Sequence, residues 1–340
     1  MVTLKDVAKR AGVGLATASR VIRESGSVSV ETAERVRAAI VDLQYRPSSI
    51  GRAMARRSLD ALGIFVPDYA DTDVRCILEA ASREARVANR IMFVTGSRSD
   101  GPVGPEAIAA VQELLDRDCD GILVVAQNLE ESDLGKIASM FEKVVFIDRP
   151  FAGNPDAAFH VAHQIGGRLA AEHLWSFGHR HFAFVTDSLL VWSNAAKLEG
   201  FRAEIFGRGA ARESIEVFES APSYQGGCES AIRILETGFG GTAVFCSDDS
   251  MAAGVAAGLR IGGVSVPDEI SVVGYGDSYA ARYCSPPLTT VAVPAAEVAQ
   301  QAVRSLLRRC YGIQCVTERE FSPCLVRRES SSSTKSDRGS

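Results

Sequence analysis

Apolar residues recur every three or four positions in three short segments near the start of the chain. This is the spacing of amphipathic helices. Thr3, followed by Asp6 three positions later, marks the start of the first segment, because such a pair caps a helix, and Gly12 ends it. Further helices are predicted over Leu15–Arg23 and about Glu31–Leu43. Three short helices joined by a glycine-containing turn predict a helix-turn-helix bundle.

From residue 61 the pattern changes to short buried strands that alternate with helices. Repeated βα units of this kind form parallel sheets with right-handed crossovers, which predicts an α/β fold. About ten strands suit two doubly wound lobes better than one, with a ligand cleft at the strand ends. The clearest predicted strands are Leu62–Val66, Ile91–Thr95, Gly121–Val125, Val144–Ile147, Phe182–Thr186, Ile215–Phe218, Ala243–Cys246 and Ser271–Gly274.

These patterns divide the chain into four parts. The helix-turn-helix head is expected over residues 1–46, and a hinge helix or linker that orders on binding over 47–60. The core is expected over 61–328, and the serine-rich tail, 329–340, is expected to be disordered. Within the core, lobe 1 should hold about 61–161 and 292–320, and lobe 2 about 162–291 and 321–328.

Charge is distributed unevenly between these parts. Residues 1–59 carry eleven Lys or Arg and five Asp or Glu, a net charge of +6, whereas the whole chain carries -5, which leaves -11 on the rest. A basic head on an acidic body suits binding to a polyanion such as DNA. The alternative is a basic helical face that is merely solvated.

Several function classes lack their sequence signals. The first residues contain no apolar signal segment and no run is long enough to span a membrane, which predicts a cytoplasmic protein. No P-loop, GxGxxG, GxSxG or HExxH motif occurs, so an enzyme is not expected. The eight cysteines form no CxxC pair and the five histidines show no zinc spacing, so neither a metal nor a cofactor is expected.

Several motifs in the chain occur together in a fixed order. The head contains Val2–Val13, Thr17–Ile22 and Tyr45–Ser48, and the core contains Val266–Tyr275 and Pro287–Val291. These motifs resemble those of the LacI/GalR family of transcriptional regulators, in which the motif at Tyr45–Ser48 is the entry to the hinge helix. The resemblance covers roughly residues 2–328, and it implies a homodimeric repressor with a periplasmic-binding-protein-like core. Such a dimer binds a pseudo-palindromic DNA operator, and a sugar, sugar acid or related metabolite binds between the lobes.

The resemblance, with the helix pattern, also indicates the DNA-contacting residues. The first exposed side chains of the second helix should meet base edges in the major groove, and Arg20 can pair with guanine through two hydrogen bonds or contact a phosphate instead. Met54 stands at the family's minor-groove wedge, and the alternative is that it packs on its dimer mate. Gly51 should weaken the hinge helix by up to about 1 kcal/mol. The expected DNA-binding residues are Thr3, Leu15, Ala16, Thr17, Ser19, Arg20, Arg23, Tyr45, Ser48, Arg52 and Met54.

The effector pocket departs most from the family pattern. Lys197 stands where the family usually has Arg, and Gly276 where an Asp usually holds sugar hydroxyls. Asp248, Asp249 and Asp277 either compensate for this loss or cap strand ends. The residues that align with the family's pocket are Asp68, Tyr69, Asp73, Gln127, Asp148, Arg149, Trp192, Ser193, Lys197, Tyr224, Asp248 and Asp277.

Two other functions use similar parts. A transport-type solute-binding protein shares the core fold, but the basic head and the missing signal segment disfavour it. A DNA-binding regulator whose core senses a partner protein has the same motifs, and only binding experiments separate it from a metabolite sensor.

Overall fold

The computed structural model describes residues 2–22, 27–45, 59–69, 72–97, 103–315 and 318–334. The chain forms two compact units, Met1–Asp60 and Ala61–Ser340, and each is described by itself. The predicted hinge segment, 47–60, lies outside the described residues except for Leu59 and Asp60.

The first unit is a bundle of three helices, α1 (Leu4–Ala11), α2 (Leu15–Ile22) and α3 (Val30–Asp42). Thr3 and Asp6 form the expected capping box, and Gly12 ends α1 with a left-handed φ of 66°. The Ser29 hydroxyl caps α3 by accepting from the Thr32 amide at 3.4 Å. The buried side chains between the helices are all valine or alanine: Val7, Ala8, Ala11, Ala18, Val21, Val36 and Ala39.

The second unit contains two six-stranded sheets. The first has the strand order β11-β5-β4-β3-β1-β2, and the second has the order β12-β10-β9-β8-β6-β7. All pairings are parallel except that of β10 with β12. The strands of the first sheet are β1 (Ala61–Val66), β2 (Ile91–Gly96), β3 (Gly121–Val125), β4 (Val144–Ile147), β5 (Ala158–Val161) and β11 (Glu320–Phe321). Those of the second are β6 (Phe182–Thr186), β7 (Ile215–Glu219), β8 (Ala243–Cys246), β9 (Ser271–Gly276), β10 (Thr289–Ala292) and β12 (Cys324–Val326).

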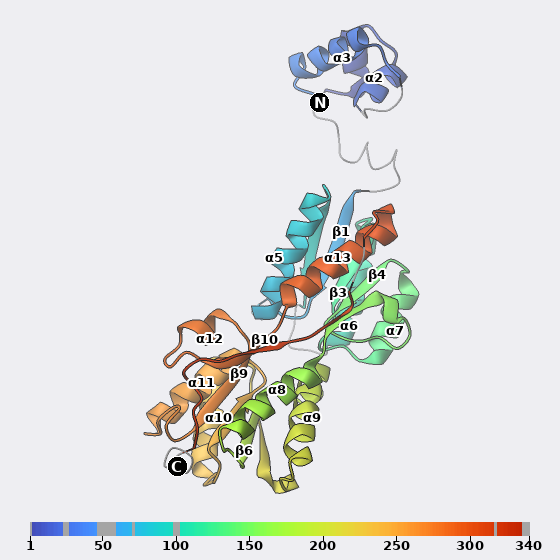
Figure 1. Cartoon of the computed structure of the whole chain (residues 1–340). Coiled ribbons are helices and arrows are strands. Elements are labelled where there is room, and N and C mark those ends of the chain that lie inside the picture. The colour runs from blue at the N-terminus through green and yellow to red at the C-terminus, as the bar shows by residue number, and fades with distance from the viewer. Residues whose placement is uncertain are drawn as a thin grey trace. The chain divides into compact units, whose positions relative to one another are not determined.

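Helices cover both faces of each sheet, which explains why the central strands are almost continuously apolar. In lobe 1, α5 (Thr72–Val87) and α13 (Ala295–Tyr311) pack on one face, and α6 (Val103–Asp116) and α7 (Glu131–Met140) on the other (Figure 1). In lobe 2, α10 (Tyr224–Glu236) and α11 (Asp249–Ile261) cover one face and α8 (His163–Ser176) and α9 (Trp192–Gly207) the other. The short helices are η1 (Pro155–Ala157), η2 (Arg212–Ser214) and α12 (Tyr279–Tyr283).

The fold class is therefore the one the sequence predicts, two parallel α/β lobes after a helical head. Within the described residues the chain passes between the sheets at 161–163, 292–295 and 321–324. The expected return to lobe 2 at residue 321 is early, because Phe321 still pairs with Val161 of β5 in lobe 1. No helix in the described ranges is both long and apolar enough to cross a membrane.

The expectation of a disordered tail is wrong for residues 329–334. Ser330 is fully buried, and its backbone carbonyl accepts from the Val272 amide at 2.8 Å. Its hydroxyl accepts from the Thr289 amide at 2.8 Å, and Ser332 continues the contact by donating its amide to Ser271 Oγ at 3.1 Å. Serine-rich composition looks disordered, but here the hydroxyls satisfy backbone groups of lobe 2. Residues 335–340 lie outside the described part.

Candidate functional site

The second helix of the head carries an exposed face at its start. Leu15, Ala16 and Arg20 are exposed, and Thr17 and Ser19 are partly exposed, whereas Ala18 and Val21 point into the bundle. Within the described part of the head, neither a hydrogen bond nor an ion pair holds the Arg20 guanidinium. A charged fork left in solvent is available to base edges or phosphates.

The other head residues predicted to contact DNA divide into two sets. Thr3 is exposed, but its hydroxyl donates to Asp6 Oδ2 at 2.7 Å within the capping box, and these Thr3 bonds lower the pKa of Asp6. Tyr45 packs partly against the head core. Arg23, Ser48, Arg52 and Met54 lie outside the described residues.

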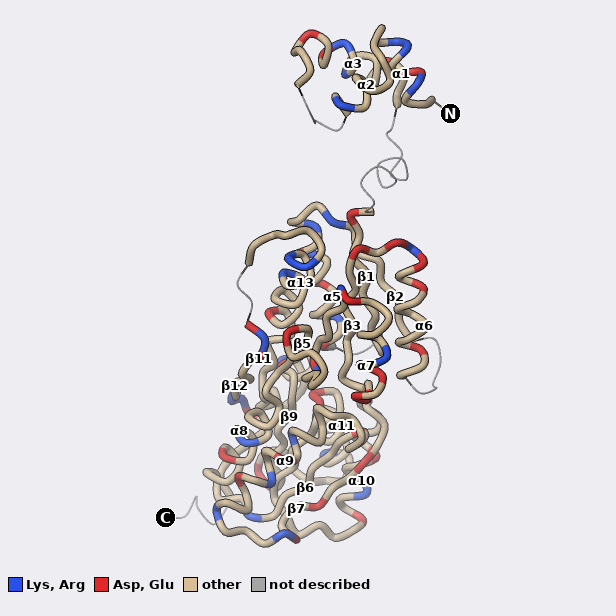
Figure 2. Tube along the Cα trace, turned by 90° about the vertical axis from the view of Figure 1, so that its right-hand side faces the viewer, with Lys and Arg blue, Asp and Glu red and all other residues tan. Residues whose placement is uncertain are grey.

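Basic residues occur on all three head helices (Figure 2). Arg10 is paired with Asp42 at 2.7 Å, both on the exposed surface. The remaining described cations, on α1, α2 and α3, are Lys5, Lys9, Arg20, Arg35 and Arg37. This spread provides positive charge around the helix that would enter a groove.

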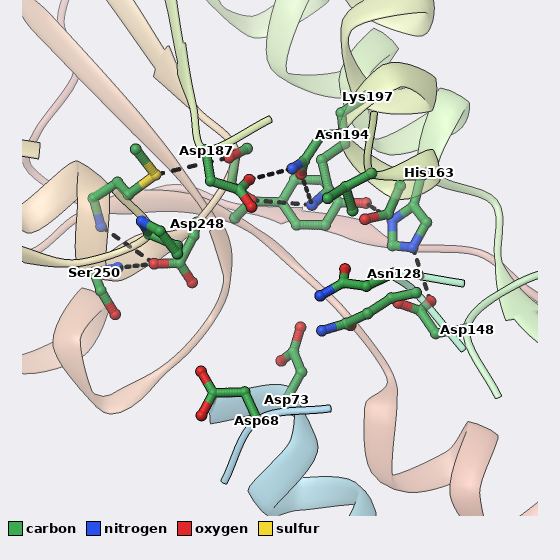
Figure 3. A pocket seen from close by; sticks show the side chains of 17 residues that line it. Asp68, Asp73, Asn128, Asp148, His163, Asp187, Asn194, Lys197, Asp248 and Ser250 are labelled. Atoms are coloured by element: carbon green, nitrogen blue, oxygen red, sulfur yellow. Dashed lines mark hydrogen bonds and ion pairs between the residues drawn. The ribbon is translucent and has the colours of Figure 1, made fainter. Parts of the chain in front are cut away.

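In the core, a cavity of about 180 Å³ lies where strands of both lobes end. Asp68 follows β1, Gln127 follows β3 and Asp148 follows β4, all in lobe 1. Asp187 follows β6 and Asp248 follows β8 in lobe 2. Figure 3 shows the side chains of the two lobes facing one another across this space. Carboxyl ends of parallel strands are where α/β folds bind ligands.

Seven of the twelve predicted effector residues line this interlobe pocket. Three of them come from lobe 2 and four from lobe 1. They are Asp68, Asp73, Gln127, Asp148, Ser193, Lys197 and Asp248.

The other five do not line it. The Tyr69 ring packs over Gly96 of β2, and the Arg149 guanidinium, whose pKa is lowered by burial, is near the acidic start of α7. The Trp192 ring contacts the rings of His160 and His163, with centroids 6.1 and 5.6 Å apart. Two further residues lie elsewhere: Tyr224, 58% exposed at the start of α10, and Asp277, which is paired with Arg282 and Arg328.

Several pocket residues were missed by reasoning from the sequence. Asp187 directly follows the predicted strand Phe182–Thr186, and Asn128 comes shortly after the predicted strand Gly121–Val125. This position at a strand end was the signal that could have identified them. Asn194 lies one turn before Lys197 on α9, and His163 begins α8. The set also includes Ser250 and Tyr275.

Lys197 is the buried cation of the pocket, 7% exposed. Its Nζ donates to Asn194 Oδ1 and to the Ser247 carbonyl, both at 3.1 Å, and lies 4.4 Å from the centre of the Tyr275 ring. Asn194 in turn donates through Nδ2 to the Asp187 carboxylate. Neutral acceptors and an aromatic face therefore hold the ammonium group, and Asp187 is linked to it through Asn194.

His163 connects the two lobes at one wall of the pocket. Its Nε2 lies 2.9 Å from Asp148 Oδ1 of lobe 1, and its Nδ1 lies 2.8 Å from Tyr275 Oη of lobe 2. Burial, and then Asp148 and Asp73, hold the pKa of the Tyr275 hydroxyl well above its usual value. The phenol therefore stays neutral. Movement of one lobe against the other changes the contact between His163 and Asp148, which joins the two lobes.

The sequence left two roles open for Asp248, Asp249 and Asp277, ligand binding or capping of strand ends, and the structure shows the partners of each. Asp248 lines the pocket and caps α11, accepting from the Ser250 and Met251 amides at 2.6 and 3.2 Å. Asp249 is fully buried, accepts from Thr290 Oγ1 at 2.6 Å and from the Ser278 amide at 2.7 Å, and burial raises its pKa. Asp277 is held by arginines. Among the described residues, no three His, Cys, Asp or Glu side chains meet closely enough to hold a metal ion.

Comparisons with known proteins agree with this geometry. Residues 3–48 match the model for bacterial regulatory proteins of the lacI family, and residues 171–331 match a periplasmic binding protein-like domain. The chain is 30% identical to the HTH-type transcriptional regulator GalS of Salmonella typhimurium over 97% of this chain and 96% of GalS.

Solved structures are similar over nearly the whole chain. A lac repressor dimer bound to operator and the anti-inducer ONPF has a TM-score of 0.87 at 26% identity, covering 97% of this chain and 99% of that one. The regulator CelR in complex with cellobiose has a TM-score of 0.70 at 26% identity, covering 97% and 100%. This chain belongs to the LacI family and is a helix-turn-helix transcriptional regulator.

Proposed function

We propose that this regulator is a homodimeric, non-enzymatic repressor that acts on DNA in the cytoplasm and responds to a small polyhydroxy metabolite. The observation that carries the proposal is the interlobe pocket, whose wall is built from strand ends of both sheets. A ligand bound there contacts both lobes at once. It therefore stabilises one arrangement of the lobes over others, and this is the requirement for coupling to a second site.

The operator-reading role is assigned to the exposed start of α2. Arg20 reads a guanine in the major groove, with Leu15 and Ala16 in apolar contact and Thr17 and Ser19 near phosphates. The lac repressor dimer, which is similar over 97% of this chain, is bound to its operator. One head alone makes too few contacts for typical specific affinity, so two heads on two half-sites are expected.

The dimer role is supported by an exposed apolar strand. β2 lies at the edge of the first sheet, and Ile91 and Val94 are 57% and 44% exposed there. An apolar sheet edge favours pairing with another chain. Tyr279 and Tyr283 of α12 form a second exposed patch, an aromatic pair whose stacked ring centroids are 6.2 Å apart.

The small-ligand role is supported by the pocket lining of amides, hydroxyls and carboxylates, which suits hydroxyl groups. CelR, which is similar in structure, is in complex with the sugar cellobiose. A core that senses a partner protein instead would not need a polar cavity between its lobes.

The test is to map the bound genomic sites, then to titrate the full-length protein on the operator with and without a panel of sugars, amino sugars and sugar acids. Two protomers should bind per operator, and one ligand should change the dissociation constant about 5- to 150-fold. Lys197→Ala should abolish that response and keep operator affinity, whereas Glu142→Gln, on the exposed surface, should change neither. Operator binding that no member of the panel alters would contradict metabolite sensing.

A further inference from the structure

The interlobe pocket is strongly acidic. Its described lining contains five aspartates, Asp68, Asp73, Asp148, Asp187 and Asp248, against one cation, Lys197. Counting only the aspartates and the lysine, the formal charge of the lining is -4. A neutral sugar does not require this excess, and a sugar acid would be repelled by it.

Lys197 does not offset the excess charge at the other end of the pocket. Its ammonium group is directed to Asn194, the Ser247 carbonyl and the Tyr275 ring, all in lobe 2. Asp68 and Asp73 belong to lobe 1 and face it across the space (Figure 3). Two other carboxylates have partners in lobe 2: Asp187 accepts from the Asn194 amide, and Asp148 lies against the His163 ring.

The acidic groups are shared between the lobes, and this gives the charge a functional consequence. Three carboxylates come from lobe 1 and two from lobe 2, so approach of the lobes brings like charges together. A positive ligand group placed between them replaces that repulsion by attraction. The elevated pKa of Tyr275, caused by burial and then by Asp148 and Asp73, is consistent with a negative potential here.

The form of the pocket narrows the type of cation. No metal-binding cluster of three side chains occurs in the described ranges, so an organic cation is favoured over a metal ion. Gln127, Asn128, Ser193 and Ser250 provide neutral donors and acceptors for hydroxyl groups. The cavity of about 180 Å³ is below the roughly 300–1,000 Å³ of drug-sized sites, so it suits a molecule of monosaccharide size.

We infer that the effector is a protonated amine on a polyhydroxy frame, an amino sugar or a close relative, whose ammonium group lies among the pocket aspartates. This inference rests on the proposed effector role of the pocket and names the ligand class. Hydroxyl groups of the ligand bind the amides and serines, and the ammonium group binds carboxylates of both lobes.

The test measures binding to the full-length protein by calorimetry at low salt and pH 7. The probes are matched sets: glucosamine, glucose, glucuronate and N-acetylglucosamine, with the same four forms of galactose and of mannose. In at least one set the amine should bind at least tenfold more tightly than its neutral, N-acetylated and acidic counterparts. Raising the salt concentration should weaken amine binding and leave the neutral sugars unchanged.

Two variants locate the ammonium group. Asp68→Asn and Asp187→Asn remove charge from lobe 1 and lobe 2 while keeping side-chain size, and each should lower affinity for the amine at least fivefold. Each should lower affinity for the neutral sugar less than affinity for the amine. Glu142→Gln, an exposed carboxylate outside the pocket, is the matched control and should have no effect.

The outcomes separate the ligand class from the effector role. If a neutral sugar or a sugar acid binds more tightly than its amine and alters operator affinity, the ligand class is wrong and the effector role stands. If none of the amines binds, the ligand class is also wrong. If no probe binds and no probe alters operator affinity, both the ligand class and the effector role are wrong. Unchanged amine affinity in both Asp variants would also overturn the assignment.

Discussion

The head and the core differ in how their functional side chains are held. In the head, a small core of valine and alanine supports a face whose Arg20 is left in solvent. In the core, phenylalanines such as Phe184, Phe201 and Phe245 are fully buried. Pocket side chains are hydrogen-bonded to one another, as Lys197 is to Asn194. Under the proposed function, the head keeps its recognition groups free for a large partner, whereas the core arranges its groups in advance for a small one.

The difference also separates local from distant contacts. The exposed face of the head that we propose to read DNA comes from one helix of eight residues, α2. The pocket joins residues from Asp68 to Tyr275, which meet only after both sheets have formed. The predictions below test this contrast, beginning with the largest expected effect.

The largest effect is expected from the aromatic core of lobe 2. Phe245→Ala removes a ring that stacks on Phe201 at 5.2 Å and should lower the free energy of unfolding by about 3–5 kcal/mol. The only tryptophans, Trp175 and Trp192, are both in lobe 2, so tryptophan fluorescence during urea unfolding reports this lobe. Val36→Ala in the head should leave the fluorescence transition unchanged. A shift of this transition in both variants would contradict independent unfolding of the head and the core.

Acid should affect the core before the head. Burial lowers the pKa of His173 and of His179 from 6.5 to about 4, so both are neutral when folded. The unfolded chain binds their protons first, so their full stability is present above pH 6.5 and is lost as the pH falls toward 4. The loss is up to about 3 kcal/mol per histidine.

Tryptophan fluorescence unfolding at several pH values measures this loss. His179→Gln should flatten the slope between pH 6.5 and 4, and His181→Gln, on an exposed side chain, should not. The head contains no histidine, so its stability should change little in that window. A core whose stability is constant from pH 6.5 to 4 would show that these rings are protonated when folded.

Arg20→Ala tests the free face of the head. Loss of a two-bond contact to guanine costs about 1–3 kcal/mol, so operator affinity should fall roughly 5- to 150-fold, with a much smaller loss on random DNA. The matched control is Arg37→Ala, which removes an exposed arginine of a different helix, α3. Fluorescence anisotropy on both DNAs provides the measurement, and an equal loss on the two would show that Arg20 contacts only phosphates.

The smallest effect concerns a helix cap in the head. Ser29→Ala removes the hydroxyl that accepts from the Thr32 amide and should destabilise α3 by about 1 kcal/mol. Hydrogen exchange of the α3 amides in the full chain should increase about fivefold. Ser27→Ala, exposed and outside the cap, should leave exchange unchanged, and an equal increase in both variants would exclude the cap as the cause.

The sequence by itself determined the elements and their class. Caps such as Thr3 with Asp6 and stops such as Gly12 act between residues a few positions apart, so they are visible in the chain. Eight strands were predicted from apolar runs, because strands covered on both faces contain few polar residues. β5, β10, β11 and β12 were missed. β5 and β10 have four residues each, β11 has two and β12 has three, and β5 includes a half-buried histidine.

The tertiary structure decided which side chains meet. It placed Asp187 and His163 in the pocket and turned Asp277 toward Arg282 and Arg328. It also packed Ser330 against β9 in a tail whose composition indicates disorder. These contacts join residues far apart in the chain, up to 112 positions for His163 and Tyr275, and sheet closure rather than local preference brings them together. The exposed start of α2 could therefore be found from the sequence, whereas the acidic character of the pocket required the fold.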